Sequence, residues 1–282
     1  MTLLFRSVAA MALFVAPASV LAQETTISVV PGGAPAGLPY ADLADLVLSA
    51  PVIATVTIRS ATRIKGAEAA DVAPDHVRFY VESDVNTLIR GREGLPPRIG
   101  YVVDSPLDWR GKPPRLKKER MILYARPVAG SMDQVQLAGP QGQQPWSQAL
   151  EDRTRSVAAE IVAPSAPPQI TGVGNAFYVA GSLPGEGETQ IFLQTADHRP
   201  VSLSVLRRPG EQPQWSVALG EIVDEAAAAP KRDTLLWYRL ACSLPPELPA
   251  ASTSALEAAD ATQAQADYRY VIEALGPCRP TS

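Results

Sequence analysis

The chain has 282 residues, of which 46% are hydrophobic and 27 are prolines, and its formal net charge is −4. This apolar content excludes a disordered chain and predicts many short strands and turns around a hydrophobic core. The mild negative charge gives no general attraction for nucleic acid, so we expect no nucleic-acid partner.

The first 22 residues have the pattern of a secretory signal peptide. Arg6 supplies a positive charge, residues 8–15 are a short apolar run, and residues 20–22 end in small side chains. The run is shorter than the roughly 20 apolar residues that a membrane-spanning helix needs. We therefore predict cleavage before Gln23, a periplasmic or secreted protein, and no transmembrane segment after cleavage. The alternative is an N-terminal anchor that is never cleaved.

Residues 23–39 are predicted to be an irregular arm because glycines and prolines interrupt them. Residues 40–162 are predicted to form a first domain that begins with a short helix at 40–49. An amphipathic helix is expected to follow Trp146 and Ser147, with Leu150, Val157 and Ile161 on one stripe. Between the helices, alternating or continuous apolar runs predict strands at 52–64, 76–89, 98–103, 120–126 and 134–138.

About five strands closed by one helix favour a small barrel or a strongly bent sheet. The order of helix, apolar strand, strand–turn–glycine segment and a strand that begins Arg-Met-Ile-Leu-Tyr resembles an OB-type or netrin-like module. The resemblance covers about residues 40–162 and implies a barrel topology. The cysteines that usually staple netrin modules are absent from this segment. No functional residue is assigned from the resemblance.

Residues 163–168 contain three prolines and no charge, which predicts a linker between two domains. Residues 169–282 are predicted to form an antiparallel β-sandwich-like domain. The apolar run 233–242 is interpreted as its most buried strand. Other strands, which alternate apolar and polar side chains, are expected at 176–180, 189–195, 200–206 and 215–219.

The C-terminal segment is predicted to be a helix, which makes the whole chain mostly β, of a β-rich α+β class. Residues 254–257 (Ser-Ala-Leu-Glu) have the pattern of a capping box, and Gly276 followed by Pro277 is a stop signal. A final strand at 268–275 is the alternative.

Cys242 and Cys278 are the only cysteines of the chain. In an oxidising compartment we expect them to pair and to dock the C-terminal helix onto the run 233–242. Closing a loop of this length stabilises a fold by about 3–4 kcal/mol. The alternative is two buried thiols.

No motif in the chain predicts catalysis, a metal or a cofactor. The only histidines are His76 and His198, and with the cysteines paired no zinc-binding spacing remains. Asp197 precedes His198, but both lie in an expected turn, where such residues are usually solvated. Nucleophile-elbow, phosphate-loop and dinucleotide motifs are absent from the sequence.

One basic cluster is the candidate binding site. Residues 110–120 hold six basic residues and one acid, and Trp109 precedes them. Such a loop attracts anions, so the expected partner is an anionic surface polymer or an envelope protein; the alternative is a solvated loop between strands. The residues expected to contact the partner are Trp109, Arg110, Lys112, Arg115, Lys117, Lys118 and Arg120.

Two small β domains on a proline linker favour an exported, non-catalytic binding or envelope-interaction protein, by analogy of architecture. The sequence does not identify its ligand. The alternative is an exported hydrolase of cell-wall or polysaccharide material that uses a pair of carboxylates. Such a pair is recognised by its separation in a cleft, which a sequence does not contain.

Overall fold

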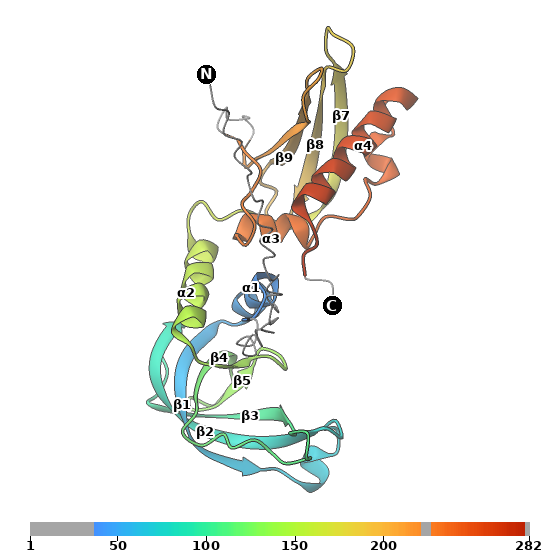
Figure 1. The fold of residues 1–282 in the computed structure, drawn as a ribbon. Helices are drawn as coiled ribbons and strands as arrows, with labels where there is room; N and C mark the ends of the chain where they lie inside the picture. Colours follow the sequence, from blue (N-terminus) through green and yellow to red (C-terminus); the bar gives the residue numbers. More distant parts are fainter. Residues whose placement is uncertain (1–36, 221–226, 280–282) are drawn as a thin grey trace, which may run out of the picture. The chain divides into compact units, whose positions relative to one another are not determined.

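The computed structural model describes residues 37–220 and 227–279 (Figure 1). The predicted signal peptide, residues 1–22, and most of the predicted arm, residues 23–39, lie outside the described residues. In the described ranges no helix is long and apolar enough to cross a membrane. The described chain is mostly β, with two antiparallel sheets and four α-helices. The predicted β-rich α+β class is confirmed.

The first sheet follows helix α1 (Tyr40–Ser49) and precedes helix α2 (Gln148–Val162). Its strand order is β3-β2-β1-β4-β5, and β6 also pairs with β4. Four strands begin at their predicted residues and β5 begins one residue later, because period-two alternation is a strong signal where one face is buried. The strands are β1 (Val52–Arg63), β2 (His76–Arg90), β3 (Arg98–Pro106), β4 (Arg120–Pro127), β5 (Val135–Leu137) and β6 (Gln143–Pro145).

This sheet bends until β3 meets the segment that enters β5. The N–H of Gly100 donates to the carbonyl of Asp133 at 2.7 Å, and Gly100 forms a parallel bridge with Gln134. A Cβ atom at Gly100 would collide with the ends of the Tyr80 and Gln134 side chains, so a larger residue here would force these side chains to move. Register shifts between β1 and β2 add to the curvature. The prediction of a bent sheet or small barrel is confirmed.

Strand β4 separates two buried clusters of apolar side chains. Met121 and Leu123 face the interior of the bent sheet, whereas Ile122 and Tyr124 face the opposite side. Helices α1 and α2 pack on this second side, where the Tyr124 hydroxyl lies 2.7 Å from Thr154 Oγ1 of α2. A strand buried on both faces has no polar side, which is why the segment Met121–Tyr124 reads as continuously apolar.

Helix α2 begins where the sequence predicts. Ser147 is its N-cap, and the Ser147 hydroxyl accepts a hydrogen bond from the N–H of Leu150 at 3.1 Å. Just before the cap, the Trp146 indole donates to Glu151 in the first turn, which fixes the direction in which the chain enters the helix.

The second sheet is a four-stranded meander with the order β10-β9-β8-β7. Helix α4 (Ala258–Leu275) packs against β7 and β8. In the described part of residues 169–282, helices take the place that a second sheet has in a sandwich. The strands are β7 (Ile170–Ala180), β8 (Gly187–Thr195), β9 (Val201–Arg207) and β10 (Gln214–Ala218). The division into two domains at residues 163–168 stays a prediction.

The run 233–242 is a helix, so its interpretation as a strand was wrong. Helix α3 (Leu235–Ala241) begins after Thr234, whose hydroxyl accepts a hydrogen bond from the N–H of Trp237. Leu235, Trp237 and Leu240 are buried, and the helix contacts α1, α2 and α4. A short helix surrounded by helices is apolar on most sides, and periodicity alone does not distinguish it from a buried strand.

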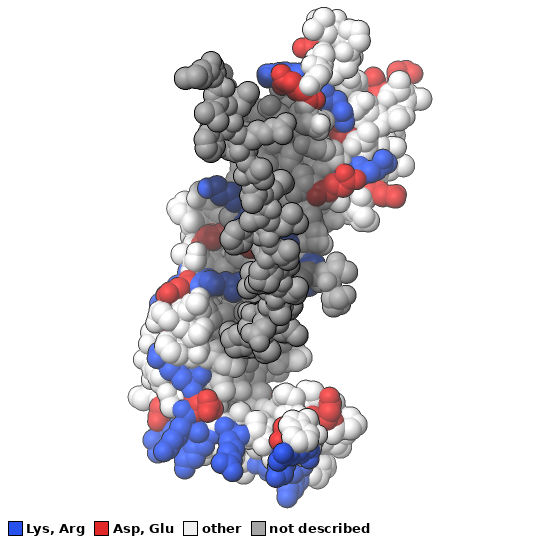
Figure 2. Space-filling model, viewed as in Figure 1, with Lys and Arg blue, Asp and Glu red and all other residues white. Residues whose placement is uncertain are grey.

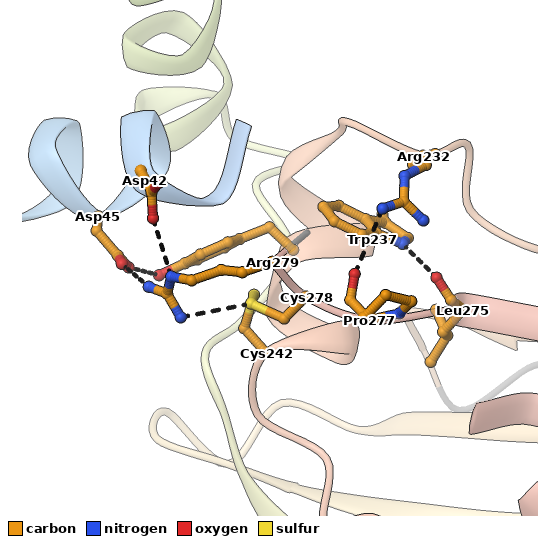
Figure 3. Close-up of a disulfide and its surroundings, with 10 residues drawn as sticks. Asp42, Asp45, Arg232, Trp237, Cys242, Leu275, Pro277, Cys278 and Arg279 are labelled. Atoms are coloured by element: carbon orange, nitrogen blue, oxygen red, sulfur yellow. Dashed lines mark hydrogen bonds and ion pairs between the residues drawn. A yellow bond between two sulfur atoms is a disulfide. The ribbon is translucent and has the colours of Figure 1, made fainter. Parts of the chain in front are cut away.

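The predicted disulfide is present and links Cys242, the C-cap of α3, to Cys278, just beyond α4 (Figure 3). Helix α4 ends at Gly276, which has a positive φ of 67°, as the stop signal predicts. Its start was predicted wrongly. Residues 250–253 form a short 3-10 helix, and α4 begins only at Ala258 after Glu257, without a side-chain cap.

Candidate functional site

The candidate site starts from the basic loop, residues 107–119, which connects β3 to β4. At its start, the N–H of Leu107 donates to the carbonyl of Asp75 at 2.8 Å. At its end, the N–H of Lys118 donates to the carbonyl of Ile58, also at 2.8 Å. Between these points Leu116 is buried in the first-sheet core. The basic loop is therefore tied to the sheet at three places.

Asp108 builds the turn at the tip of the basic loop. Its carboxylate accepts hydrogen bonds from the N–H groups of Arg110 and Lys112, each at 2.8 Å, and Gly111 has a positive φ of 71°. The turn leaves Trp109 85% exposed, with the Arg110 guanidinium 4.2 Å from the centre of its ring. A large aromatic side chain is thus held in solvent beside a cation.

Five of the predicted cations lie exposed on the basic loop. The ion pairs formed within the described ranges involve other residues. Figure 2 shows Lys and Arg side chains gathered over the lower part of the first sheet in this view. The five exposed cations are Arg110, Lys112, Arg115, Lys117 and Lys118.

Arg120 does not belong to this exposed group, although the sequence placed it there. Its guanidinium stacks on the Trp146 ring at 3.7 Å and lies 4.0 Å from Glu151 of α2. Arg120 starts β4, and its side chain faces the base of α2 rather than solvent alone. Its contacts make it part of the packing between β4 and α2.

A groove lies on the outer faces of β2 and β3, beside the connection between β5 and β6. Its volume is about 690 Å³, which is within the range of ligand sites. The basic loop begins at one end of this groove, because Pro106 lines it and Leu107 is the next residue. The groove is lined by Asp71, Ala73, His76, Arg78, Val102, Val103, Asp104, Pro106, Gln136, Leu137, Gly139, Pro140 and Gln141.

Arg78 is the central charged residue of the groove. It lies opposite Asp104 on β3, to which it donates from Nε at 2.8 Å and Nη2 at 2.9 Å. It also donates to Asp71 from Nη1 at 2.8 Å and Nη2 at 3.2 Å, and to the carbonyl of Glu68. These hydrogen bonds hold the pKa of Asp71 below its ordinary value. The groove therefore contains two carboxylates oriented by one guanidinium.

The two histidines make no catalytic arrangement in the described residues. His76 Nδ1 lies 2.8 Å from Asp75, and no Ser, Thr, Cys or Lys lines the groove beside it. Asp197 pairs with Arg199 at 2.8 Å, and His198 has a positive φ of 61° in the turn. Among the described residues, no three His, Cys, Asp or Glu side chains are grouped so that they could hold a metal ion.

The groove is not predicted by any local pattern in the sequence. One signal was available: His76, Arg78 and Tyr80 are the polar positions of an alternating strand, and Asp104 is polar on the next strand. An antiparallel pairing of the two strands brings such positions together on one face. Strand β5, which carries Gln136, and the β5–β6 connection, which carries Gln141, could not be placed beside them, because the bending of the sheet onto β3 is not visible in local sequence.

The comparisons with known proteins assign no family: the chain matches no protein-family model, and no curated protein matches it.

Proposed function

We propose that this chain is an exported, non-catalytic binding protein whose basic loop contacts an anionic surface polymer of the cell envelope. The observation that carries the proposal is Trp109, which is 85% exposed on a turn fixed by the Asp108 carboxylate. An exposed tryptophan in an ordered turn is costly to leave in water and useful at a binding surface.

The charge of the basic loop supports an anionic partner. The basic loop has five exposed cations and two exposed acids, Asp108 and Glu119, although the chain as a whole has a net charge of −4. A local concentration of positive charge on an acidic protein attracts anions to that place and not to the rest of the surface. The anchors at Leu107, Leu116 and Lys118 reduce the conformational entropy that the loop would lose on binding.

The groove supports binding more than hydrolysis. A glycosidase needs one carboxyl group with a raised pKa to act as the acid, opposite a second carboxylate. Here Asp71 and Asp104 are both held by Arg78, and hydrogen bonds from Arg78 lower the pKa of Asp71. An ionised carboxylate held by a guanidinium is a hydrogen-bond acceptor, not a proton donor.

Export is supported by the signal-like residues 1–22 and by the disulfide between Cys242 and Cys278. The proposed location is the periplasm or the medium, with a mature chain that begins near Gln23. Intact-mass measurement of the chain recovered from periplasm, medium and cytosol tests this. A full-length mass in the cytosolic fraction with both thiols free would contradict it.

The binding proposal is tested by chromatography of the mature chain on heparin at low salt. The test variant is Lys112→Gln/Lys117→Gln/Lys118→Asn. Asparagine is chosen at position 118 because Lys118 has a positive φ of 75°, which asparagine tolerates. We expect the wild-type chain to be retained and the variant to flow through, since the contacts are electrostatic and screened by salt.

The matched control removes three positive charges from exposed positions on the second-sheet side of the chain. The control variant is Arg208→Gln/Lys231→Gln/Arg269→Gln. It should elute at nearly the salt concentration at which the wild-type chain elutes, although its net charge equals that of the test variant. Equal elution of the test variant and the wild type would refute a role for the basic loop.

A further inference from the structure

The groove is a poor receptor for an anion. Each of the five N–H groups of Arg78 is directed at Asp71, Asp104 or the carbonyl of Glu68, so the guanidinium has no donor left for a ligand. The two carboxylates that hold it remain accessible, with 73% of the Asp71 side chain and 38% of the Asp104 side chain exposed. A carboxylate accepts several hydrogen bonds, so both can accept more.

Apart from His76, the remaining residues that line the groove have no ionisable side chain. Gln136 of β5 and Gln141 of the β5–β6 connection line one wall with exposed side chains, and each amide can donate and accept. Val102 is 46% exposed in the opposite wall, on β3. Acceptors fixed in place, amides and a small apolar surface together fit a ligand that has hydroxyl groups and C–H faces.

The basic loop follows the groove directly along the chain, and the two differ in their chemistry. The last residue of β3, Pro106, lines the groove, and the basic loop begins at Leu107. A ligand that extends from one to the other needs hydroxyl groups at one end and negative charges at the other. A simple polyanion has no hydroxyl groups for the groove, and a neutral glycan has no charges for the loop.

We infer that the ligand is an acidic polysaccharide, with hydroxyl groups of its sugar rings bound in the groove by Asp71, Asp104 and the two glutamines. Its anionic groups contact the basic loop, and one ring stacks on Trp109. This inference rests on the proposed function, because it identifies the class of anionic polymer that the basic loop binds.

The test uses one substitution for which electrostatics alone and a hydrogen bond to a sugar predict opposite changes in affinity. Asp71→Asn removes a negative charge, so on electrostatic grounds alone it strengthens the binding of every polyanion. If Asp71 accepts a hydrogen bond from a sugar hydroxyl, the same substitution weakens the binding of a polysaccharide. The probes are heparin, which is a sulfated polysaccharide, and inorganic polyphosphate, which carries negative charge without sugars.

Dissociation constants are measured by calorimetry on the mature chain. We expect Asp71→Asn to weaken heparin binding by about fivefold, the equivalent of one hydrogen bond, and to leave polyphosphate binding equal or tighter. Gln136→Ala/Gln141→Ala should also weaken heparin binding without changing polyphosphate binding. The matched control is Asp197→Asn, because Asp197 is likewise held by an arginine, Arg199, but lies outside the groove; it should not weaken heparin binding.

The outcomes separate this inference from the proposed function. If Asp71→Asn tightens the binding of both probes, and Gln136→Ala/Gln141→Ala changes the affinity for neither, the polysaccharide inference is overturned. The basic loop would still stand as a polyanion site, provided that neutralising Lys112, Lys117 and Lys118 abolishes binding of both probes. If that triple variant changes neither affinity, or if the wild-type chain binds neither probe at low salt, the proposed function is overturned together with the inference.

Discussion

Arg279 forms an ion pair with Asp42, at 2.9 Å between Nε and Oδ1, although the two residues are 237 positions apart in the chain (Figure 3). Arg279 also pairs with Asp45 of α1, which accepts a hydrogen bond from the Tyr238 hydroxyl of α3. The neighbouring residue, Cys278, is bonded to Cys242 at the end of α3. The disulfide thus holds the C-terminal segment where its arginine meets the first helix.

We predict that the disulfide contributes more stability than the ion pairs it positions. Cys242→Ser/Cys278→Ser should lower the free energy of unfolding by about 3–4 kcal/mol, because the unfolded chain regains the freedom of a 36-residue loop. Arg279→Ala should cost about 1 kcal/mol or less, since 52% of the Arg279 side chain is exposed to solvent. Urea unfolding with and without reductant measures both.

The control for this prediction is the serine variant itself, which should unfold at the same urea concentration whether or not reductant is present. The wild-type chain should shift to a lower urea concentration when it is reduced. An unchanged midpoint for the reduced wild type would mean that packing of α3 and α4 alone fixes the C-terminal segment.

The first sheet was predictable because its strands carry local signals. In β2, for example, Val77, Phe79 and Val81 are buried and alternate with polar side chains, so the strand and its inner face are readable from the sequence alone. The Ser147 cap of α2 is equally local. The pairing of Cys242 with Cys278 followed from the compartment and from there being no other cysteine.

The features that could not be predicted from the sequence depend on tertiary contacts that leave no local signal. The α3 helix is apolar on most sides because other helices surround it, so Trp237 and its neighbours resembled a buried strand. From its position in the sequence, Arg120 resembled another cation of the basic loop, but its guanidinium stacks on the Trp146 ring. The basic loop could be located from composition, whereas the groove needed the closure of β5 onto β3.

Asp267 on α4 gives a second prediction, because its carboxylate is fully buried. It accepts hydrogen bonds from Thr189 of β8, from Arg207 at the end of β9, at 2.5 Å, and from Gln263. Arg207→Met should lower the unfolding free energy by about 3–5 kcal/mol, because it leaves a buried charge without its partner. Urea unfolding at neutral pH measures the loss.

The matched control for this ion pair is Arg208→Met, one residue further along, where the side chain is exposed and its carboxylate partner is 4.0 Å away. We expect a change within about 0.5 kcal/mol. The double variant Arg207→Met/Asp267→Asn should recover part of the loss, since it no longer buries an unpaired charge. No recovery would show that Arg207 acts through its packing.

Glu151 predicts how stability responds to acid. Hydrogen bonds from the Trp146 indole, first, and from Arg155 lower the pKa of Glu151 below its ordinary value of 4.5. A carboxyl group with a lower pKa in the folded state stabilises the fold above its unfolded pKa. That contribution is lost as the pH falls through the folded pKa. Unfolding free energy should therefore decrease as the pH falls below about 4.5.

Glu151→Gln tests the assignment of this acid sensitivity. The variant should be less stable than the wild type at pH 7, by about 1–2 kcal/mol, and should lose less stability between pH 4.5 and pH 3. Thermal or urea unfolding across this window measures both effects. Parallel pH profiles for the two proteins would assign the acid sensitivity to other carboxylates.

Two residues of the basic loop should differ in their effect on stability, because Leu116 anchors the loop to the core whereas Trp109 is exposed to solvent. Leu116→Ala should lower the unfolding free energy by about 2–3 kcal/mol, because Leu116 is only 8% exposed and belongs to the first-sheet core. Trp109→Ala should change it by no more than about 0.5 kcal/mol, because that side chain is in solvent. Heparin retention should fall in both variants. Leu116→Ala removes an anchor that orders the loop, and Trp109→Ala removes a side chain that contacts the ligand. If Trp109→Ala destabilised the fold as much as Leu116→Ala, Trp109 would be a packing residue, and the main support for a binding surface at this turn would be gone.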